Sequence, residues 1–103
     1  MRRGKYGNKK TVIDGKTFAS KREAGRYALL AALQQCDRIS NLRTQVRYPL
    51  VVNGVKVCAY VADFVYHENG REIIEDSKGF RTREYILKKK LMKACLGIDI
   101  KEV

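Results

Sequence analysis

The chain has 103 residues, of which 45% are apolar, and this length supports one compact core but not two. Twenty-two Lys and Arg against eleven Asp and Glu give a net charge of +11, which favours a polyanionic partner. A solvated basic surface, or RNA binding of the ribosomal kind, explains the same charge. No apolar run approaches the roughly 18 residues of a membrane span, and the N-terminus lacks a signal peptide's apolar segment, so we expect a cytoplasmic protein without a membrane partner.

The first ten residues, MRRGKYGNKK, contain five Lys and Arg and show no apolar periodicity. They predict a flexible basic arm over residues 1–10, in which Arg2 and Arg3 could follow a phosphate backbone. We expect one folded domain over residues 11–103. At its start, Asp14-Gly15 lies between short β-prone flanks and predicts a small hairpin.

A helix is predicted over about residues 21–35. The stretch from Ser20 to Glu23 fits a capping box, in which a serine and a glutamate satisfy backbone donors at the helix N-terminus. Apolar residues then recur at helical spacing, at Ala24, Tyr27, Ala28 and Ala31.

Three β-rich runs follow, over residues 42–52, 55–67 and 71–78. Asn53-Gly54 separates the first two runs and Asn69-Gly70 the last two, and this dipeptide is typical of hairpin turns whose central residues need positive φ. The pattern predicts an antiparallel meander, with Pro49 near an edge or a bulge.

Residues 82–97 predict a second helix with Gly97 at its C-terminal cap. The expected buried stripe consists of Leu87, Leu91, Ala94 and Cys95. Residues 98–103 alternate like a short strand, and this strand could pair parallel with residues 71–78 because a helix connects the two. The predicted order is α-β-β-β-α-β, an α/β (α+β) fold with a mixed central sheet flanked by helices.

Strand alternation places Asp76 and Lys78 on one face of their strand, and Asp63 lies on the preceding strand. Counting across the Asn69-Gly70 turn places Asp76 opposite a residue close to Asp63, so two carboxylates and an ammonium group could converge. Converging carboxylates need a cation, and hard oxygen ligands suit magnesium or manganese. A divalent ion held this way would support phosphodiester hydrolysis, with Lys78 assisting water and phosphate.

Structural interpretations of the same residues remain open. Backbone donors could satisfy Asp63, and Asp76 with Lys78 could form a solvated ion pair that contributes little. Glu23 could cap its own helix, although it lies on one helical face with Tyr27 and could complete the site. Gln45 is polar inside an apolar strand and could support the site or face solvent.

Three stretches resemble small phage and prophage proteins of the PD-(D/E)XK nuclease superfamily: FASKREAGRY, TQVRYPLVVNGVKVCAYVADFVY and EIIEDSKGFRTREYILKKKLMKACLGIDIKEV. The resemblance covers about residues 12–103 and implies a restriction-endonuclease-like core. It implies that Glu23, Asp63 and Asp76 hold Mg²⁺ or Mn²⁺ and that Lys78 is the fourth catalytic residue. Ala62 stands where the eponymous proline is expected.

This resemblance further implies a DNA endonuclease similar to Holliday-junction resolvases, phage-encoded and acting on branched DNA in the bacterial cytoplasm during recombination or genome processing. From this resemblance we expect a homodimer and, as a partner, a phage replication or recombination protein. Arg81, Arg83, Lys88 and Lys89 would contact DNA phosphates. The alternative is a basic nucleic-acid-binding or phage assembly module that keeps the fold without catalysis.

Overall fold

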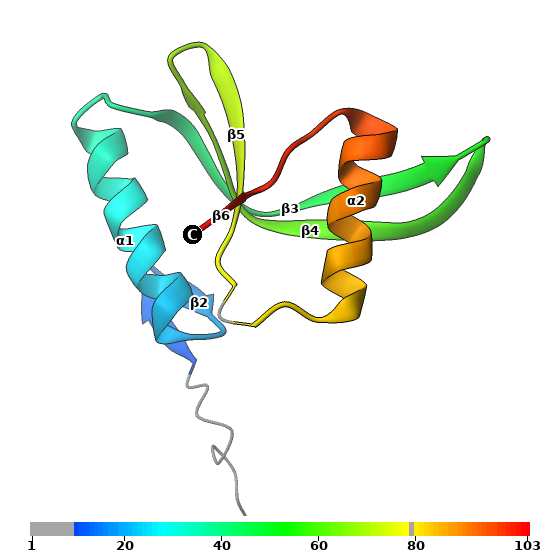
Figure 1. The fold of residues 1–103 in the computed structure, drawn as a ribbon. Helices are drawn as coiled ribbons and strands as arrows, with labels where there is room; N and C mark the ends of the chain where they lie inside the picture. Colours follow the sequence, from blue (N-terminus) through cyan, green and yellow to red (C-terminus); the bar gives the residue numbers. More distant parts are fainter. Residues whose placement is uncertain (1–9, 79) are drawn as a thin grey trace, which may run out of the picture.

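The computed structural model describes residues 10–78 and 80–103, so Arg2 and Arg3 of the predicted arm lie outside the described residues. This part of the chain is a mixed α/β structure with two helices and two sheets (Figure 1). Its elements are β1 (Thr11–Ile13), β2 (Lys16–Phe18), α1 (Lys21–Gln35), β3 (Ser40–Val52), β4 (Val55–Glu68), β5 (Arg71–Asp76), α2 (Arg83–Leu96) and β6 (Lys101–Glu102). No helix among the described residues is long and apolar enough to cross a membrane.

The four-stranded sheet has the order β3-β4-β5-β6, with antiparallel pairing from β3 to β5 and parallel pairing of β5 with β6. The predicted element order is therefore confirmed, preceded by the small β1–β2 hairpin. Pro49 lies on β3, the edge strand, just before a register shift between Leu50 and Val51, as predicted.

Local turn chemistry explains the three hairpins. Asp14-Gly15, Asn53-Gly54 and Asn69-Gly70 all have positive φ at both residues, from 52° to 79°. Only glycine, and to a lesser degree Asn and Asp, adopts this backbone region at low cost. The turns therefore fix where each strand reverses and how the strands pair.

Helix α1 begins and ends where the sequence predicts. The side chain of Ser20 accepts a hydrogen bond from the backbone N–H of Glu23 at 3.2 Å, which satisfies one free donor of the first turn. Ala24, Tyr27 and Leu30 form the buried face. Ala28, predicted to belong to that face, is exposed.

Helix α2 has the predicted extent but a different buried face. Thr82 caps its first turn, and Gly97 ends it with φ of 69°. The fully buried residues are Tyr85 and Met92, seven positions apart. The predicted stripe is wrong at Leu87, which is 57% exposed, and at Ala94, which is also exposed, because the Tyr85 ring and the flexible Met92 side chain fill the space over the sheet instead.

Two hydrophobic clusters lie on opposite faces of the sheet. The cluster under α1 includes Phe18, Tyr27, Leu30, Phe64 and Tyr66. The cluster under α2 includes Leu50, Tyr60, Ala62, Val65, Ile74 and Met92.

Strand β4 changes face at Asp63. Residues two apart on a strand normally point to the same side, yet Ala62 belongs to the α2 cluster and Phe64 to the α1 cluster. The β3 residue at this level, Gln45, has φ of 54°, which is uncommon for a residue of its type. Figure 1 shows the sheet bending here, with β5 leaving in one direction and the β3–β4 ribbon in another.

Strand β5 ends at Asp76, two residues before the predicted end. The backbone N–H of Ser77 donates to the Asp63 carboxylate at 2.8 Å instead of continuing the strand ladder. Lys78 consequently lies just beyond the strand.

Candidate active site

Three polar residues occupy neighbouring positions on adjacent strands at the point where β4 changes face: Gln45 on β3, Asp63 on β4 and Asp76 on β5. The β4–β5 register pairs Phe64 with Glu75, and the β3–β4 register pairs Thr44 with Phe64. The regular β4–β5 pairing ends there, and continuing both registers by one residue brings Asp63 level with Gln45 on β3 and Asp76 on β5. The sequence-based counting that placed Asp76 close to Asp63 is thus confirmed.

Asp63 is a partly buried carboxylate in an unfavourable electrostatic environment. Burial is the main cause that raises the pKa of Asp63 to about 7, and the negative charges of Asp76 and Glu23 add to this effect. The backbone hydrogen bond from Ser77 acts in the opposite direction. The structural interpretation, in which a backbone donor satisfies Asp63, therefore holds for one hydrogen bond. That bond does not compensate the negative charge of the carboxylate.

Asp76 is 1% exposed, so its interaction with Lys78 is not the solvated ion pair of the alternative interpretation. One carboxylate oxygen accepts a hydrogen bond from the Tyr60 hydroxyl. The other, Oδ1, lies 3.4 Å from Lys78 Nζ but has no hydrogen-bond donor among the described residues. A buried carboxylate oxygen without a donor is costly, which marks this atom as a candidate ligand.

The Lys78 ammonium group lies between Asp76 and an aromatic ring. Its Nζ is 4.7 Å from the centre of the Tyr85 ring, within range of a cation–π interaction. The side chain is 32% exposed, so its charged end is anchored on the protein while still reaching solvent.

Glu23 turns toward the sheet and away from its own helix terminus. Its Oε2 accepts a hydrogen bond from Gln45 Nε2 at 3.0 Å, and Glu23 is 8% exposed. Burial, followed by the negative charge of Asp76, raises the pKa of Glu23, while Lys78 and the Gln45 hydrogen bond lower it. The electrostatic coupling of Glu23 with Asp76 and Lys78 links α1 to the end of β5.

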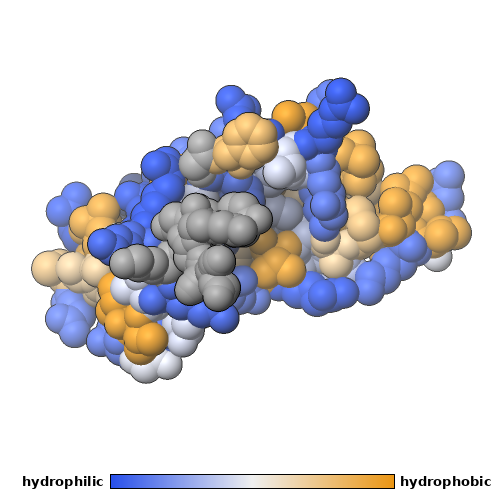
Figure 2. All heavy atoms as spheres, turned by 90° about the horizontal axis from the view of Figure 1, so that it is seen from below, coloured by the Kyte–Doolittle hydropathy of each residue, from blue (hydrophilic) through white to orange (hydrophobic). Residues whose placement is uncertain are grey.

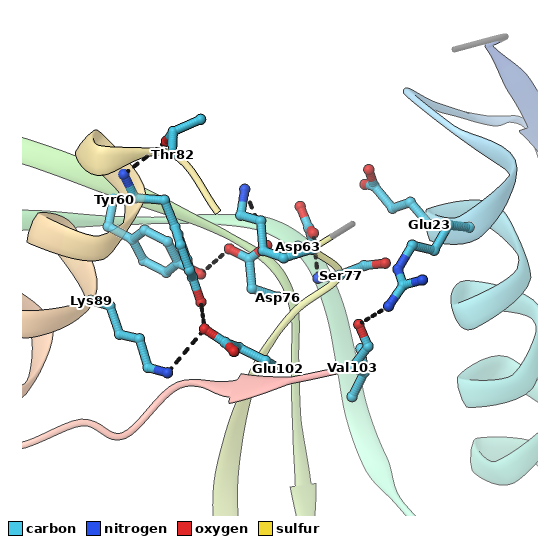
Figure 3. A network of polar contacts seen from close by, with 12 residues as sticks. Glu23, Tyr60, Asp63, Asp76, Ser77, Thr82, Lys89, Glu102 and Val103 are labelled. Carbon is cyan, nitrogen blue, oxygen red and sulfur yellow. Dashed lines mark hydrogen bonds and ion pairs between the residues drawn. The ribbon is translucent and has the colours of Figure 1, made fainter. Parts of the chain in front are cut away.

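Two hollows adjoin these residues. One, of about 420 Å³, is lined by Glu23, Asp63, Ser77 and Lys78 together with Arg22 and Phe80. The other, of about 260 Å³, is lined by Tyr60, Asp76, Lys78, Tyr85 and Lys88. Figure 3 shows Asp63 and Asp76 lying between Tyr60 on one side and Glu23 on the other. Lys78 therefore borders both hollows, whereas Asp63 lines the larger one and the buried Asp76 lines the smaller one.

Residues 10–78 and 80–103 contain no group of three or more His, Cys, Asp or Glu side chains arranged to hold one metal ion. Asp63 and Asp76 nevertheless suit a hard divalent cation chemically. Asp76 Oδ1 has no hydrogen-bond donor among the described residues, and the pKa of Asp63 is raised by burial and, to a lesser degree, by the negative charges of Asp76 and Glu23, which a cation would offset.

The basic residues predicted to contact DNA lie in three different places. Lys88 lines the smaller hollow and pairs with Glu84 at 3.0 Å. Arg81 and Lys89 both pair with Glu102, at 3.6 and 2.9 Å, and line a separate cleft of about 330 Å³. Arg83 is exposed at the start of α2. Only Lys88 among these four borders the same hollow as Asp76.

Two tyrosines that the sequence did not predict lie at the site. The Tyr60 hydroxyl donates a hydrogen bond to the Asp76 carboxylate, and the Tyr85 ring lies beside Lys78. Both tyrosines are buried. Only a general rule could have indicated this contact from the sequence: a buried tyrosine hydroxyl usually needs a polar partner. For Tyr60 that partner is Asp76.

Comparison with protein families identifies the family to which the chain belongs. The chain is a member of the family described as protein of unknown function DUF1064, which matches residues 3–101. No curated protein matches the chain.

Proposed function

We propose that the protein is a metal-dependent DNA endonuclease of the PD-(D/E)XK type, with a restriction-endonuclease-like fold. The observation that carries the proposal is that Asp63 and Asp76 lie one position beyond the Phe64–Glu75 pair, with Lys78 Nζ 3.4 Å from Asp76 Oδ1, which has no hydrogen-bond partner among the described residues. Glu23 reaches the same region from α1 and is electrostatically coupled to Asp76. Glu23, Asp63 and Asp76 come from α1, β4 and β5, Lys78 follows β5, and the four match the functional positions that the resemblance implies.

In this proposal Asp63 and Asp76 hold Mg²⁺ or Mn²⁺, and Glu23 is the third acidic group. Such an ion, when bound, would polarise a phosphate oxygen and lower the pKa of a coordinated water. Tyr60 holds the Asp76 carboxylate in place, and Gln45 does the same for Glu23. Lys78 donates to an oxygen of the scissile phosphate, where its positive charge offsets the charge that develops during attack.

DNA is the proposed substrate because the chain carries a net charge of +11. Lys88 borders the hollow at Asp76 and would contact a phosphate next to the scissile one. We propose that Arg81, Arg83, Lys89, Arg2 and Arg3 contact more distant phosphates. Branched or otherwise structured DNA, cleaved in the bacterial cytoplasm during phage recombination or genome processing, is the proposed substrate class, with a homodimer making paired cuts.

The test is a cleavage assay on labelled four-way, flap, nicked, single-stranded and duplex DNA, with magnesium or manganese against chelator. We expect metal-dependent products that Asp63→Asn, Asp76→Asn and Lys78→Met each reduce by about 100-fold or more, while DNA binding persists. Asp99→Asn is the matched control, because Asp99 is exposed and pairs only with Lys93 among the described residues. Equal, metal-dependent cleavage by purified Asp63→Asn and Asp76→Asn would overturn the proposal.

A second candidate function is a nucleic-acid-binding or phage assembly module that does not cleave. The absence of a three-ligand metal group among the described residues favours it, as does the hydrogen bond that already satisfies one Asp63 oxygen. It predicts salt-sensitive DNA binding that neither chelator nor Asp63→Asn changes. The same set of assays separates the two functions.

A further inference from the structure

Phe80 is an aromatic residue that neither the hydrophobic core nor the proposed catalytic group uses. Its side chain is 79% exposed, the largest value for a large apolar residue within residues 10–78 and 80–103. Its ring makes no contact with another aromatic ring in that part of the chain. Because burying an aromatic ring is favourable, Phe80 offers a surface on which a flat or apolar group of another molecule can pack.

The connection that carries Phe80 is held at both ends. At the β5 end, the backbone N–H of Ser77 donates to the Asp63 carboxylate at 2.8 Å. At the α2 end, the side chain of Thr82 accepts a hydrogen bond from the backbone N–H of Tyr85 at 3.1 Å. These two anchors restrict where the Phe80 ring can lie, although no other ring packs against it.

Phe80 belongs to the wall of the larger hollow of the candidate active site. Glu23, Asp63 and Lys78 line the same hollow of about 420 Å³. A single exposed apolar side chain is ordinary on a protein surface and needs no explanation. An exposed ring that shares a hollow with two carboxylates and an ammonium group is different, because it is placed to touch whatever those groups bind.

Cationic side chains lie around Phe80. Lys78 and Arg22 line the hollow with it, and the side chain of Arg81, the next residue in the chain, is 58% exposed. The Arg22 guanidinium donates to the Val103 carbonyl oxygen at 2.8 Å, which holds its charge in place. Figure 2 views the molecule from the end at which this connection lies and shows mostly hydrophilic side chains around separate apolar ones. Cations beside an exposed ring suit nucleic acid, since the cations hold phosphates while the ring stacks on a base.

The chemistry of the hollow favours a nucleobase over an apolar protein surface. Apart from Ala19 and Phe80, every residue that lines it is polar or charged. An apolar protein surface would remove water from those groups without pairing them. A base needs only one ring to stack on. Because neighbouring bases cover both faces of a base inside a duplex, only an unpaired or unstacked base can offer a face to Phe80.

We propose that Phe80 is a specificity residue whose ring stacks on an unpaired base next to the scissile phosphate. This inference rests on the proposed function, and it names the feature by which the substrate is recognised. That feature is a nucleotide with an exposed base face, as in a single strand or a flap. Lys78 holds the phosphate while Phe80 positions the base, and a continuous duplex gains nothing from the ring.

The test measures DNA affinity by fluorescence anisotropy in the presence of chelator, so that binding is followed without cleavage. The two labelled probes are a single-stranded oligonucleotide and the duplex of the same sequence. We expect Phe80→Ala to weaken single-strand binding by about tenfold, equal to about 1.4 kcal/mol, which lies within the range for loss of one stacked base. Its affinity for the duplex should stay within about twofold of wild type, since no phosphate contact is lost.

Two further substitutions at the same position separate stacking from mere apolar contact. Phe80→Trp keeps a flat ring and should bind the single strand like wild type. Phe80→Leu keeps apolar character without the ring and should resemble Phe80→Ala. Leu87→Ala is the matched control, because Leu87 is also exposed, at 57%, but lines neither hollow of the site. It should bind both probes like wild type.

The salt dependence of binding supplies a readout that loss of structure would change. Each phosphate contact adds to the slope of log affinity against log salt concentration, whereas base stacking does not. Wild type and Phe80→Ala should therefore give parallel lines on the single strand. A shallower slope for Phe80→Ala would show that the substitution disturbs phosphate contacts, and it would overturn the stacking role.

Three other results would also overturn the inference. They are equal loss of affinity for both probes in Phe80→Ala, no loss for either probe, and single-strand binding by Phe80→Leu at the wild-type level. The proposed function fails by a different result, the absence of metal-dependent products from wild-type protein in the cleavage assay. Wild-type protein that binds neither probe would overturn both.

Discussion

Asp63 accepts a hydrogen bond from the backbone N–H of Ser77 at 2.8 Å, and through this bond β4 holds the segment that follows β5. Asp76 and Lys78 flank the donor in the chain. The same carboxylate that we propose as a metal ligand thus also fixes the position of the two other residues at the site. Substitutions of Asp63 should consequently affect structure and chemistry together, and asparagine is the least disruptive choice because it keeps an accepting oxygen.

The stability of the metal-free protein should depend on the ionisation of Asp63. Its folded-state pKa of about 7 lies above the ordinary value of 3.8, so the folded state binds the extra proton between these two values. Stability from this group is therefore present below about pH 4 and lost as pH rises to about 7. Relative to Asp63→Asn, wild type should lose about 2 to 4 kcal/mol over this range, measured by urea unfolding with chelator. A difference that does not change with pH would contradict this prediction.

Divalent ions should stabilise the folded protein in the absence of DNA. An ion that binds only the folded state at ten times its dissociation constant contributes about 1.4 kcal/mol, which corresponds to a rise of roughly 5 to 10 °C in the melting temperature. We expect this shift with magnesium or manganese near pH 8 for wild type and for Asp99→Asn. Asp63→Asn and Asp76→Asn should show no shift in thermal unfolding, and equal shifts in all four proteins would indicate binding elsewhere.

At position 45, a glycine substitution should leave the protein more stable than an alanine substitution, which is the reverse of the usual order in a strand. Its φ of 54° strains any side chain with a Cβ atom, whereas glycine adopts this conformation freely. Both Gln45→Gly and Gln45→Ala lose the hydrogen bond to Glu23, so the comparison isolates the backbone. We expect the glycine variant to be more stable by about 1 kcal/mol in chemical unfolding.

The control for Gln45 lies two residues further along β3. Arg47 pairs regularly with Val61 and is not among the residues of positive φ. Arg47→Gly should therefore be less stable than Arg47→Ala. The same order at both positions would show that the backbone at Gln45 is not strained.

The ion pair between Arg26 and Glu75 should be important for folding. Glu75 is fully buried, and Arg26 donates to both of its oxygens at 2.8 and 2.6 Å. Removing Arg26 leaves a buried carboxylate with only the Tyr66 hydroxyl and a distant Lys101. Arg26→Ala should cost about 3 kcal/mol of unfolding free energy.

An exposed ion pair provides the comparison for Arg26. Arg43 and Glu72 form a 2.9 Å contact with both side chains more than one-third exposed. Arg43→Ala should cost less than about 1 kcal/mol. Comparable losses in the two variants, measured by the same urea titration, would refute the distinction between the two pairs.

The elements that the sequence predicted correctly depend on local chemistry. Asn-Gly turns need positive φ wherever they occur, and a two-residue turn then determines the register, which is why Asp63 and Asp76 could be paired by counting. Ser20 and Gly97 act on the nearest helical turn, so the helix bounds followed from them.

The features that the sequence did not reveal depend on tertiary contacts. The buried face of α2 is determined by which side chains fill the space above β3 and β4, and periodicity alone favoured Leu87 over Tyr85. The end of β5 at Asp76 results from a hydrogen bond with a residue fourteen positions away. The contact between Tyr60 and Asp76 likewise requires the two strands to be paired and bent.

The change of face at Asp63 directs neighbouring side chains of β4 to different helices, with Ala62 in the cluster under α2 and Phe64 in the cluster under α1. Val65 and Ile74 also belong to the α2 cluster, so one apolar core spans β4 on both sides of Asp63. The two helices therefore cannot move apart without disturbing packing that they share around β4. We expect hydrogen exchange to give the β4 amides on both sides of Asp63 a single protection class.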